Sequence, residues 1–191
     1  IIKKHYNYLL DEIEMLREIG DTFSDKSRIT AIELSLSNGN NVAILDDGFQ
    51  DFSIKPNFSI LCFNSKQLIG NGLVIPSGPL RERLSAVNRA DCIIINGNKS
   101  NDTLEFEKKI TENLMGKKLH FFYSNYKIKN IDKLKNKSIT AFAGIGNQSN
   151  FFDLLKKNKL DIKATYSFPD HYNYSQLDFD QITSDKSTKV F

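Results

Sequence analysis

The sequence lacks tryptophan, has only two cysteines and four prolines, and contains no long apolar run. Cys62 and Cys92 form no CxxC pair and have no nearby histidine at metal-ligand spacing. We therefore expect both to be reduced, buried small residues, which excludes a disulfide-stapled secreted domain and a zinc site. No stretch approaches the roughly 18 apolar residues of a membrane-spanning helix, and no signal peptide opens the sequence.

The sequence also lacks a strong excess of charge of either sign. Lys and Arg number 26 against 23 Asp and Glu, and the basic residues are scattered, as between Lys127 and Lys137. This spacing is typical of a solvated face, so we expect no nucleic-acid partner, although a mild attraction to anionic lipid or phosphate stays open. With 191 residues and 40% hydrophobic content, the chain can bury a core in one large or two small domains.

Apolar strands alternate with amphipathic helices along the chain, which predicts an α/β fold. The pattern is typical of a P-loop-NTPase-like, mostly parallel sheet with helices on both faces. After an irregular lead over 1–8, it predicts helices over 10–19, 25–36, 104–114, 150–158 and 176–182. Strands are predicted over 42–45, 58–63, 90–96, 118–123, 139–143, 162–168 and 189–191. A polar linker after Gly97 predicts two lobes, 1–97 and 98–191.

Two adjacent carboxylates, Asp46 and Asp47, follow the apolar run Val42 to Leu45. Such a run suits a central parallel strand that is buried on both faces. In open α/β sheets ligands bind beyond the carboxyl ends of the strands, where a carboxylate can hold Mg²⁺ against nucleotide phosphates. The alternative is a strand that ends in an Asp-Asp-Gly turn.

Two loops are candidates for phosphate contacts. The segment 67–79 is rich in glycine and proline and leads into Arg81 and Glu82, which could equally form a solvated surface pair. The turn Gly144-Ile145-Gly146-Asn147 lies between a strand and a helix, where free amides converge. Because Ser149 stands where the dinucleotide fingerprint has Gly or Ala, a tight structural turn is the alternative.

His171 and Asp11 are candidate proton-transfer groups. His171 follows Pro169-Asp170 at the end of a strand, and a histidine beside an aspartate can act as a base near neutral pH. The alternative is a helix cap by Asp170 with an incidental imidazole. Asp11 stands in the first turn of a helix, where capping is the alternative role.

Five motifs occur in order along nearly the whole chain: LDDGFQ at 45–50, GNGLVIPSGPLRE at 70–82, RAD at 89–91, AGIGN followed by FF at 143–152, and FPDHYNY at 168–174. Together they resemble the tetraacyldisaccharide 4′-kinase family, the lipid A 4′-kinases. The resemblance implies transfer of the ATP γ-phosphate to the 4′-hydroxyl of tetraacyldisaccharide 1-phosphate, which gives lipid IVA. It further implies a monomer that works at the membrane surface, on the cytoplasmic face of the Gram-negative inner membrane.

The resemblance also implies roles for individual residues. Asp46 and Asp47 would support Mg²⁺, and Arg81 with Glu82 would arrange phosphate and metal. Asp11 would be the base for the sugar hydroxyl, with His171 as its partner. The turn residues Gly144, Gly146 and Asn147 would contact the nucleotide, ATP.

The sequence departs from the family pattern at several places. It contains no GxxxxGK[ST] P-loop, which we expect before Ile1 together with a membrane-associating helix, so we expect the 191 residues alone to be an inactive internal fragment that also lacks its C-terminal end. Leu10 and Ile13 replace the Gly and Pro that flank the family's Asp-Glu pair, and Asp51 replaces a frequent His. A Rossmann-like dinucleotide-binding enzyme and a non-catalytic module remain the alternatives.

Overall fold

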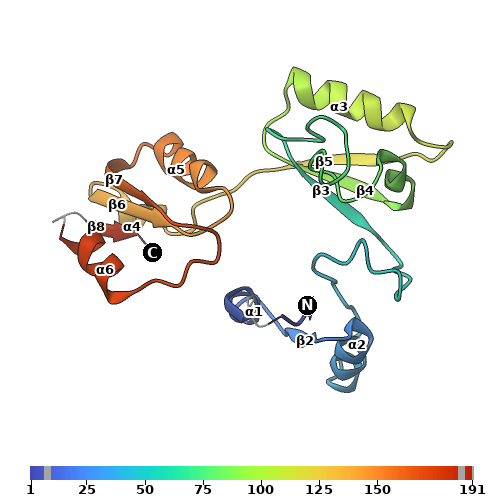
Figure 1. Cartoon of the computed structure of the whole chain (residues 1–191), viewed down its shortest axis with the longest axis horizontal. Helices are drawn as coiled ribbons and strands as arrows, with labels where there is room; N and C mark the ends of the chain where they lie inside the picture. The colour runs from blue at the N-terminus through green and yellow to red at the C-terminus, as the bar shows by residue number, and fades with distance from the viewer. Residues whose placement is uncertain (7–9, 185–187, 191) are drawn as a thin grey trace. The chain divides into compact units, whose positions relative to one another are not determined.

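The computed structural model describes residues 1–6, 10–184 and 188–190. The chain forms two compact units, 1–126 and 127–191, and each is described by itself. This division differs from the boundary expected near Gly97. Strand β5 (His120–Ser124) pairs in parallel with β4 (Cys92–Asn96), so the segment after Gly97 completes a sheet of the first unit (Figure 1).

The first unit begins with two short parallel strands that the sequence did not predict. β1 (Ile2–Lys4) pairs with β2 (Phe23–Asp25), and Ile2 is fully buried. Helices α1 (Leu10–Arg17) and α2 (Arg28–Ser37) lie near the predicted positions. The Ser27 side chain caps the start of α2, and the helix ends at Asn38 before Gly39, whose φ of 86° favours glycine. The expected irregular lead over 1–8 is therefore wrong for 2–4, while residues 7–9 lie outside the described part.

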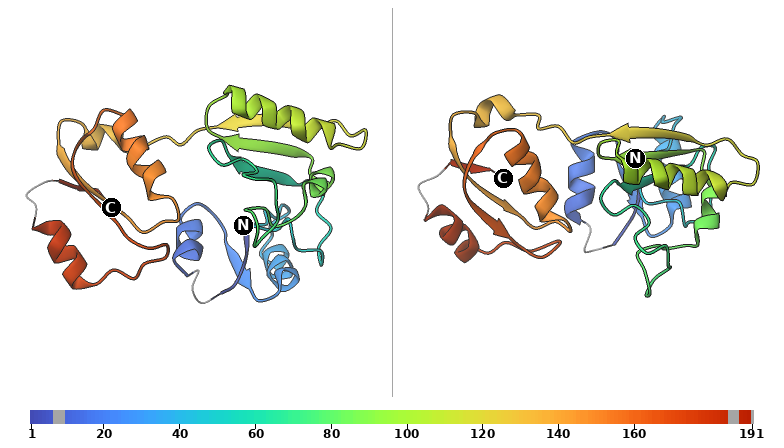
Figure 2. Two further views of the ribbon diagram at one scale, coloured as in Figure 1. Left: turned by 45° about the horizontal axis from the view of Figure 1, so that its top comes forward. Right: turned by 90° about the horizontal axis from the view of Figure 1, so that it is seen from above.

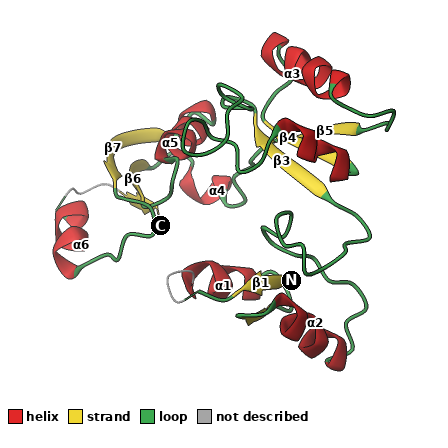
Figure 3. Ribbon diagram, turned by 45° about the vertical axis from the view of Figure 1, so that its right-hand side comes forward, coloured by secondary structure: helices red, strands yellow, loops and turns green. Residues whose placement is uncertain are grey.

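The predicted buried strand over 42–45 is also wrong. Leu45 forms only an isolated bridge to Ile2, and the side chains of Val42 and Ile44 are 73% and 65% exposed. The backbone pairs with β1, through Ile2 N to Ile44 O and Asp46 N to Ile2 O. No second strand flanks residues 42–45 among the described residues. The chain between α2 and β3 (Ile60–Asn64) is therefore largely loop (Figure 3).

The main sheet of the first unit has the order β3-β4-β5, and all its strands are parallel. Helix α3 (Asn101–Glu112) packs on it through Phe106 and Ile110, against Ile93 and Ile95. Side chains that alternate to the other face are more open: Ile60 and Phe122 are about half exposed. For the same reason Cys62 is exposed, contrary to expectation, whereas Cys92 is buried as expected. The short 3-10 helix η2 (Leu84–Arg89) precedes β4.

The second unit has its own parallel sheet, with β6 (Ser138–Ala143) between β7 (Asp161–Ser167) and β8 (Thr188–Val190). Helix α5 (Gln148–Lys157) follows β6 and lies against β6 and β7 (Figure 2). Helices α4 (Ile131–Leu134) and α6 (Gln176–Thr183) complete the unit. Its core contains Ile139, Ala141, Phe152, Leu155 and Leu160. Phe191, the predicted last strand residue, lies outside the described part.

The predicted fold class, a parallel α/β protein, is confirmed in both units. None of the helices in the described part of the chain has the length and apolar character needed to cross a membrane.

Candidate active site

The Asp46–Asp47 turn is attached to the first strand of the chain. Asp46 N donates a 3.0 Å hydrogen bond to Ile2 O, which holds the pair beside β1. Asp47 has a φ of 52°, in the left-handed region that non-glycine residues seldom adopt. Next to it, a Cβ added at Gly48 would lie 2.7 Å from Leu45 Cβ, so the turn needs glycine there.

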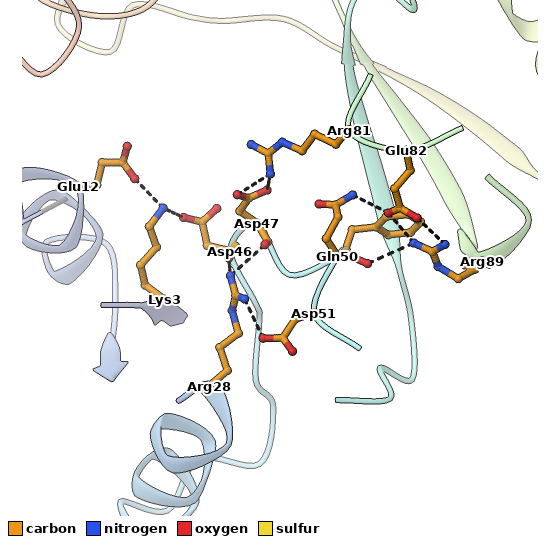
Figure 4. Close-up of polar contacts among 11 residues, drawn as sticks. Lys3, Glu12, Arg28, Asp46, Asp47, Gln50, Asp51, Arg81, Glu82 and Arg89 are labelled. Atoms are coloured by element: carbon orange, nitrogen blue, oxygen red, sulfur yellow. Dashed lines mark hydrogen bonds and ion pairs between the residues drawn. The ribbon is translucent and has the colours of Figure 1, made fainter. Parts of the chain in front are cut away.

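Asp46 forms an ion pair with Lys3, a residue for which the sequence offered no functional signal. Lys3 Nζ lies 2.5 Å from Asp46 Oδ2 and 2.6 Å from Glu12 Oε2, and Lys3 is only 7% exposed (Figure 4). Burial by itself would lower the pKa of Lys3, but its hydrogen bonds to the two carboxylates outweigh this effect and raise the pKa. The ammonium group therefore stays charged and joins β1, α1 and the Asp46 turn.

Asp47 pairs with a different cation. Arg81 Nη1 lies 2.6 Å from Asp47 Oδ1 and 2.8 Å from Oδ2, and the hydrogen bonds to Asp47 raise the pKa of Arg81. Both side chains are more than half exposed. The structure thus brings the DDG and PLRE motifs together, a contact that the sequence did not predict.

Glu82 points to a neighbouring cluster instead. Arg89 Nη1 and Nη2 each lie 2.8 Å from one Glu82 oxygen, and Gln50 Nε2 donates to Glu82 Oε1 at 3.0 Å. The Arg89 guanidinium also stacks on the rings of Phe49 and Phe52, at 4.5 and 4.9 Å from their centroids. The hydrogen bonds from Arg89, helped by Gln50, lower the pKa of Glu82. Glu82 is therefore held as a carboxylate.

A hollow of about 310 Å³ lies over this part of the first unit. This volume is near the lower end of the range for small-molecule sites. It includes Asp47, but Asp46 is not among its lining residues. Basic, acidic and amide side chains line it: Lys4, Tyr6, Arg28, Asp47, Gln50, Asp51 and Arg81. This mixture suits a phosphate-bearing ligand that is also contacted by a carboxylate-bound cation.

The chemistry of these residues fits Mg²⁺ only in its usual nucleotide-bound form. In the described residues no group of three or more His, Cys, Asp or Glu side chains could hold a metal ion by itself. Mg²⁺ in kinases is commonly bound by one or two carboxylates together with substrate phosphates and water. Asp47, which lies in the hollow with an exposed carboxylate, meets that requirement better than Asp46.

Asp11 and His171 belong to different units, so their predicted pairing stays a prediction. Asp11 lies in the first turn of α1, beside Glu12, which contacts Lys3. His171 lies in the loop between β7 and α6 and has a φ of 53°. Neighbouring aromatic side chains pack closely in this loop: the Phe168 ring centroid lies 4.9 Å from that of Tyr172 and 5.1 Å from that of Tyr174.

In the second unit, the Gly144–Asn147 turn packs against the same loop. An added Cβ at Gly144 would lie 2.8 Å from the Tyr174 hydroxyl, and one at Gly146 would lie 3.2 Å from Asp170 Oδ2. The Asn147 side chain accepts a hydrogen bond from Asn150 N at 3.2 Å and thereby caps α5. Nucleotide contact by this turn stays a prediction, and local packing already accounts for both glycines and the asparagine.

Comparisons with known proteins agree with these motifs. The sequence model of the family described as Tetraacyldisaccharide-1-P 4'-kinase matches residues 10–191. A tetraacyldisaccharide 4'-kinase of Pelagibacter ubique is 41% identical over 184 residues, which cover 95% of this chain and 57% of the relative. A relative with the same name from Colwellia psychrerythraea is 31% identical, over 93% of this chain and 56% of its own length.

A crystal structure of LpxK from Aquifex aeolicus in complex with ATP has a similar fold, with a TM-score of 0.61 and 27% sequence identity. The similarity covers 87% of this chain and 53% of that one. The chain thus spans about half the length of the curated relatives that it matches. With a family model and relatives that match over nearly all of its residues, the chain belongs to the tetraacyldisaccharide 4'-kinase family.

Proposed function

We propose that the gene product transfers the ATP γ-phosphate to the 4′-hydroxyl of tetraacyldisaccharide 1-phosphate. Family membership supports the reaction, and the ATP complex of the Aquifex aeolicus relative supports the nucleotide. The observation that carries the proposal is the Asp47–Arg81 contact, because it joins two motifs 34 residues apart beside a hollow of suitable size. Phosphoryl transfer depends mainly on positioning and on neutralising charge, which an exposed carboxylate and guanidinium can provide.

Four residues of the first unit would have separate roles in binding the metal and the phosphates. Asp47 would hold Mg²⁺ from the hollow, and Asp46, which is paired with Lys3, would support the turn. Mg²⁺, when bound with ATP, would neutralise charge that develops on the phosphates. Arg81 would orient phosphate oxygens, and Glu82 would help to arrange the metal's surroundings from its position beside Arg89.

The proton of the sugar hydroxyl would go to the carboxylate of Asp11, with His171 as its partner. Gly144, Gly146 and Asn147 would complete the nucleotide surface. The lipid substrate would be taken from the cytoplasmic face of the bacterial inner membrane, by a monomer that binds the membrane surface. These roles follow the family resemblance.

The test is phosphorylation of tetraacyldisaccharide 1-phosphate by the gene product with ATP and Mg²⁺, beside Asp47→Asn and His171→Ala. We expect product from the wild type and losses of at least about 100-fold in Asp47→Asn. Asp132→Asn, which changes a carboxylate that is 86% exposed, is the matched control and should leave the rate unchanged. A folded wild type that makes no product would contradict the proposal, and tight NAD binding would then favour the dinucleotide-binding alternative. Full activity of His171→Ala would remove His171 from the mechanism.

A further inference from the structure

Arg28, the first residue of α2, makes hydrogen bonds to both carbonyls of the Asp46–Asp47 turn. Its Nη2 donates to Asp46 O and to Asp47 O, each at 2.9 Å (Figure 4). The Arg28 side chain is only 8% exposed. A nearly buried guanidinium is unusual, and here its Nη2 group binds the backbone of the two candidate metal-binding residues.

A third contact supplies the balancing charge. Arg28 Nη1 donates to Asp51 Oδ2 at 2.9 Å, and Asp51 also accepts from the Ser53 amide and hydroxyl. The loop from Asp46 to Asp51 is thereby closed around one guanidinium. A buried charge without such a partner would be strongly unfavourable.

The geometry explains why an arginine is needed at this position. A planar guanidinium presents several N–H donors in a fixed fork, whereas a lysine ammonium is a point charge on a flexible stem. One arm of the fork, Nη2, binds two consecutive carbonyls while the other, Nη1, binds Asp51. Between the two carbonyls, Asp47 adopts its left-handed φ of 52°. Such a backbone conformation persists only where its surroundings hold it. With both carbonyls bound to Arg28, the Asp47 carboxylate is presented to Arg81.

We propose that Arg28 is a positioning residue that fixes the Asp46–Asp47 turn for metal binding, with Asp51 as its counter-charge. The inference rests on the proposed function, in which Asp47 serves Mg²⁺ and ATP. It goes beyond that function because Arg28 itself need not touch substrate. In the sequence, Asp51 stands out only because it replaces the family's frequent His. The structure shows that it pairs with Arg28.

The test compares Arg28→Lys, Arg28→Met and Asp51→Asn in the gene product, with kcat, the KM for ATP and the Mg²⁺ concentration for half-maximal rate measured for each. We expect Arg28→Met to lower kcat and raise the Mg²⁺ requirement, by about 10- to 100-fold in total, as for other residues that orient metal ligands. Arg28→Lys should show the same shift although it keeps the charge. Asp51→Asn should show a smaller shift, because both carbonyl contacts can remain.

Lys117→Met is the matched control. Lys117 also donates to a backbone carbonyl, Ala90 O, and to a carboxylate, Asp91, but it lies outside the proposed site. We expect its Mg²⁺ requirement to be that of the wild type. If Arg28→Met does not fold, the Mg²⁺ requirements of Arg28→Lys and Asp51→Asn test the proposal in its place. An unchanged Mg²⁺ requirement in folded Arg28→Lys would overturn the proposal, even if kcat falls. Failure of the proposed function is distinct, because the folded wild type itself would then make no product.

Discussion

Arg81 holds Asp47 through a single nitrogen, which lies 2.6 Å from one carboxylate oxygen and 2.8 Å from the other. Because the two side chains are exposed, this pair contributes little to stability. A ligand that brings its own cation can take over the carboxylate and leave the guanidinium for a phosphate. Under the proposed function, the Asp47–Arg81 contact would be the arrangement of the site before ATP and Mg²⁺ bind.

Replacing Arg81 by Met should slow phosphoryl transfer by about 100-fold or more, because in the proposed function it removes the donor that would orient the transferring phosphate. Steady-state kinetics of the gene product with ATP and the lipid acceptor will measure this. Arg83→Met removes an exposed arginine two residues later and should have little effect. Equal losses in both variants would show that general positive charge, and not the position of Arg81, matters.

Replacing Arg89 by Lys or Met should lower kcat about tenfold, because Glu82 loses its paired donors and its fixed orientation. Lysine keeps the charge but cannot reproduce the two parallel contacts or stack in the same way on Phe49 and Phe52. The measurement is kcat for both variants with their folding checked by circular dichroism. A fully active Arg89→Lys would mean that charge alone holds Glu82.

Asp51 should make stability depend on pH in the acid range. The hydrogen bond from the Ser53 hydroxyl, followed by that from Arg28, lowers the pKa of Asp51 from 3.8 to about 2. Since the folded-state pKa is the lower one, its stabilising effect is present above about pH 4 and is lost as pH falls towards 2. Unfolding by urea between pH 2 and 6 should show a shallower acid loss for Asp51→Asn than for the wild type.

Asp132→Asn, at an exposed carboxylate, is the control for that acid range. Its unfolding free energy should follow the wild-type pH profile. If Asp51→Asn follows the wild-type profile as well, the contact with Arg28 and Ser53 does not persist in solution.

Gly144→Ala should destabilise the second unit by about 1–3 kcal/mol, because the new methyl group would meet the Tyr174 hydroxyl at 2.8 Å. Tyr174→Phe removes that oxygen, so the double variant should be more stable than the sum of the single changes predicts. Urea unfolding of the four proteins will measure this coupling. Additive effects would show that the destabilisation comes instead from the backbone oxygen of Pro169, which lies 3.2 Å from the position of the added Cβ.

The sequence predicted the longer apolar runs well, whether the strand lies at the centre or at the edge of its sheet. The run 90–96 became β4, which pairs with β3 and β5, and 139–143 became most of β6, which pairs with β7 and β8. It failed for β1 and β2, whose three residues each are too short for a periodic signal. It failed again over 42–45, where the apolar run is present but, within the part of the chain that the structure describes, only β1 pairs with it.

The sequence by itself determined the family and the parallel α/β class, because five ordered motifs and the alternation of strands and helices are local patterns. It also identified Asp47 and Arg81 as candidates, but without their contact. Only the tertiary structure decided which cation meets which carboxylate: Lys3 meets Asp46, Arg81 meets Asp47, and Arg28 binds the turn between them. These partners lie from 18 to 43 residues apart, and it is chain folding, not local sequence, that brings such charges within hydrogen-bonding distance.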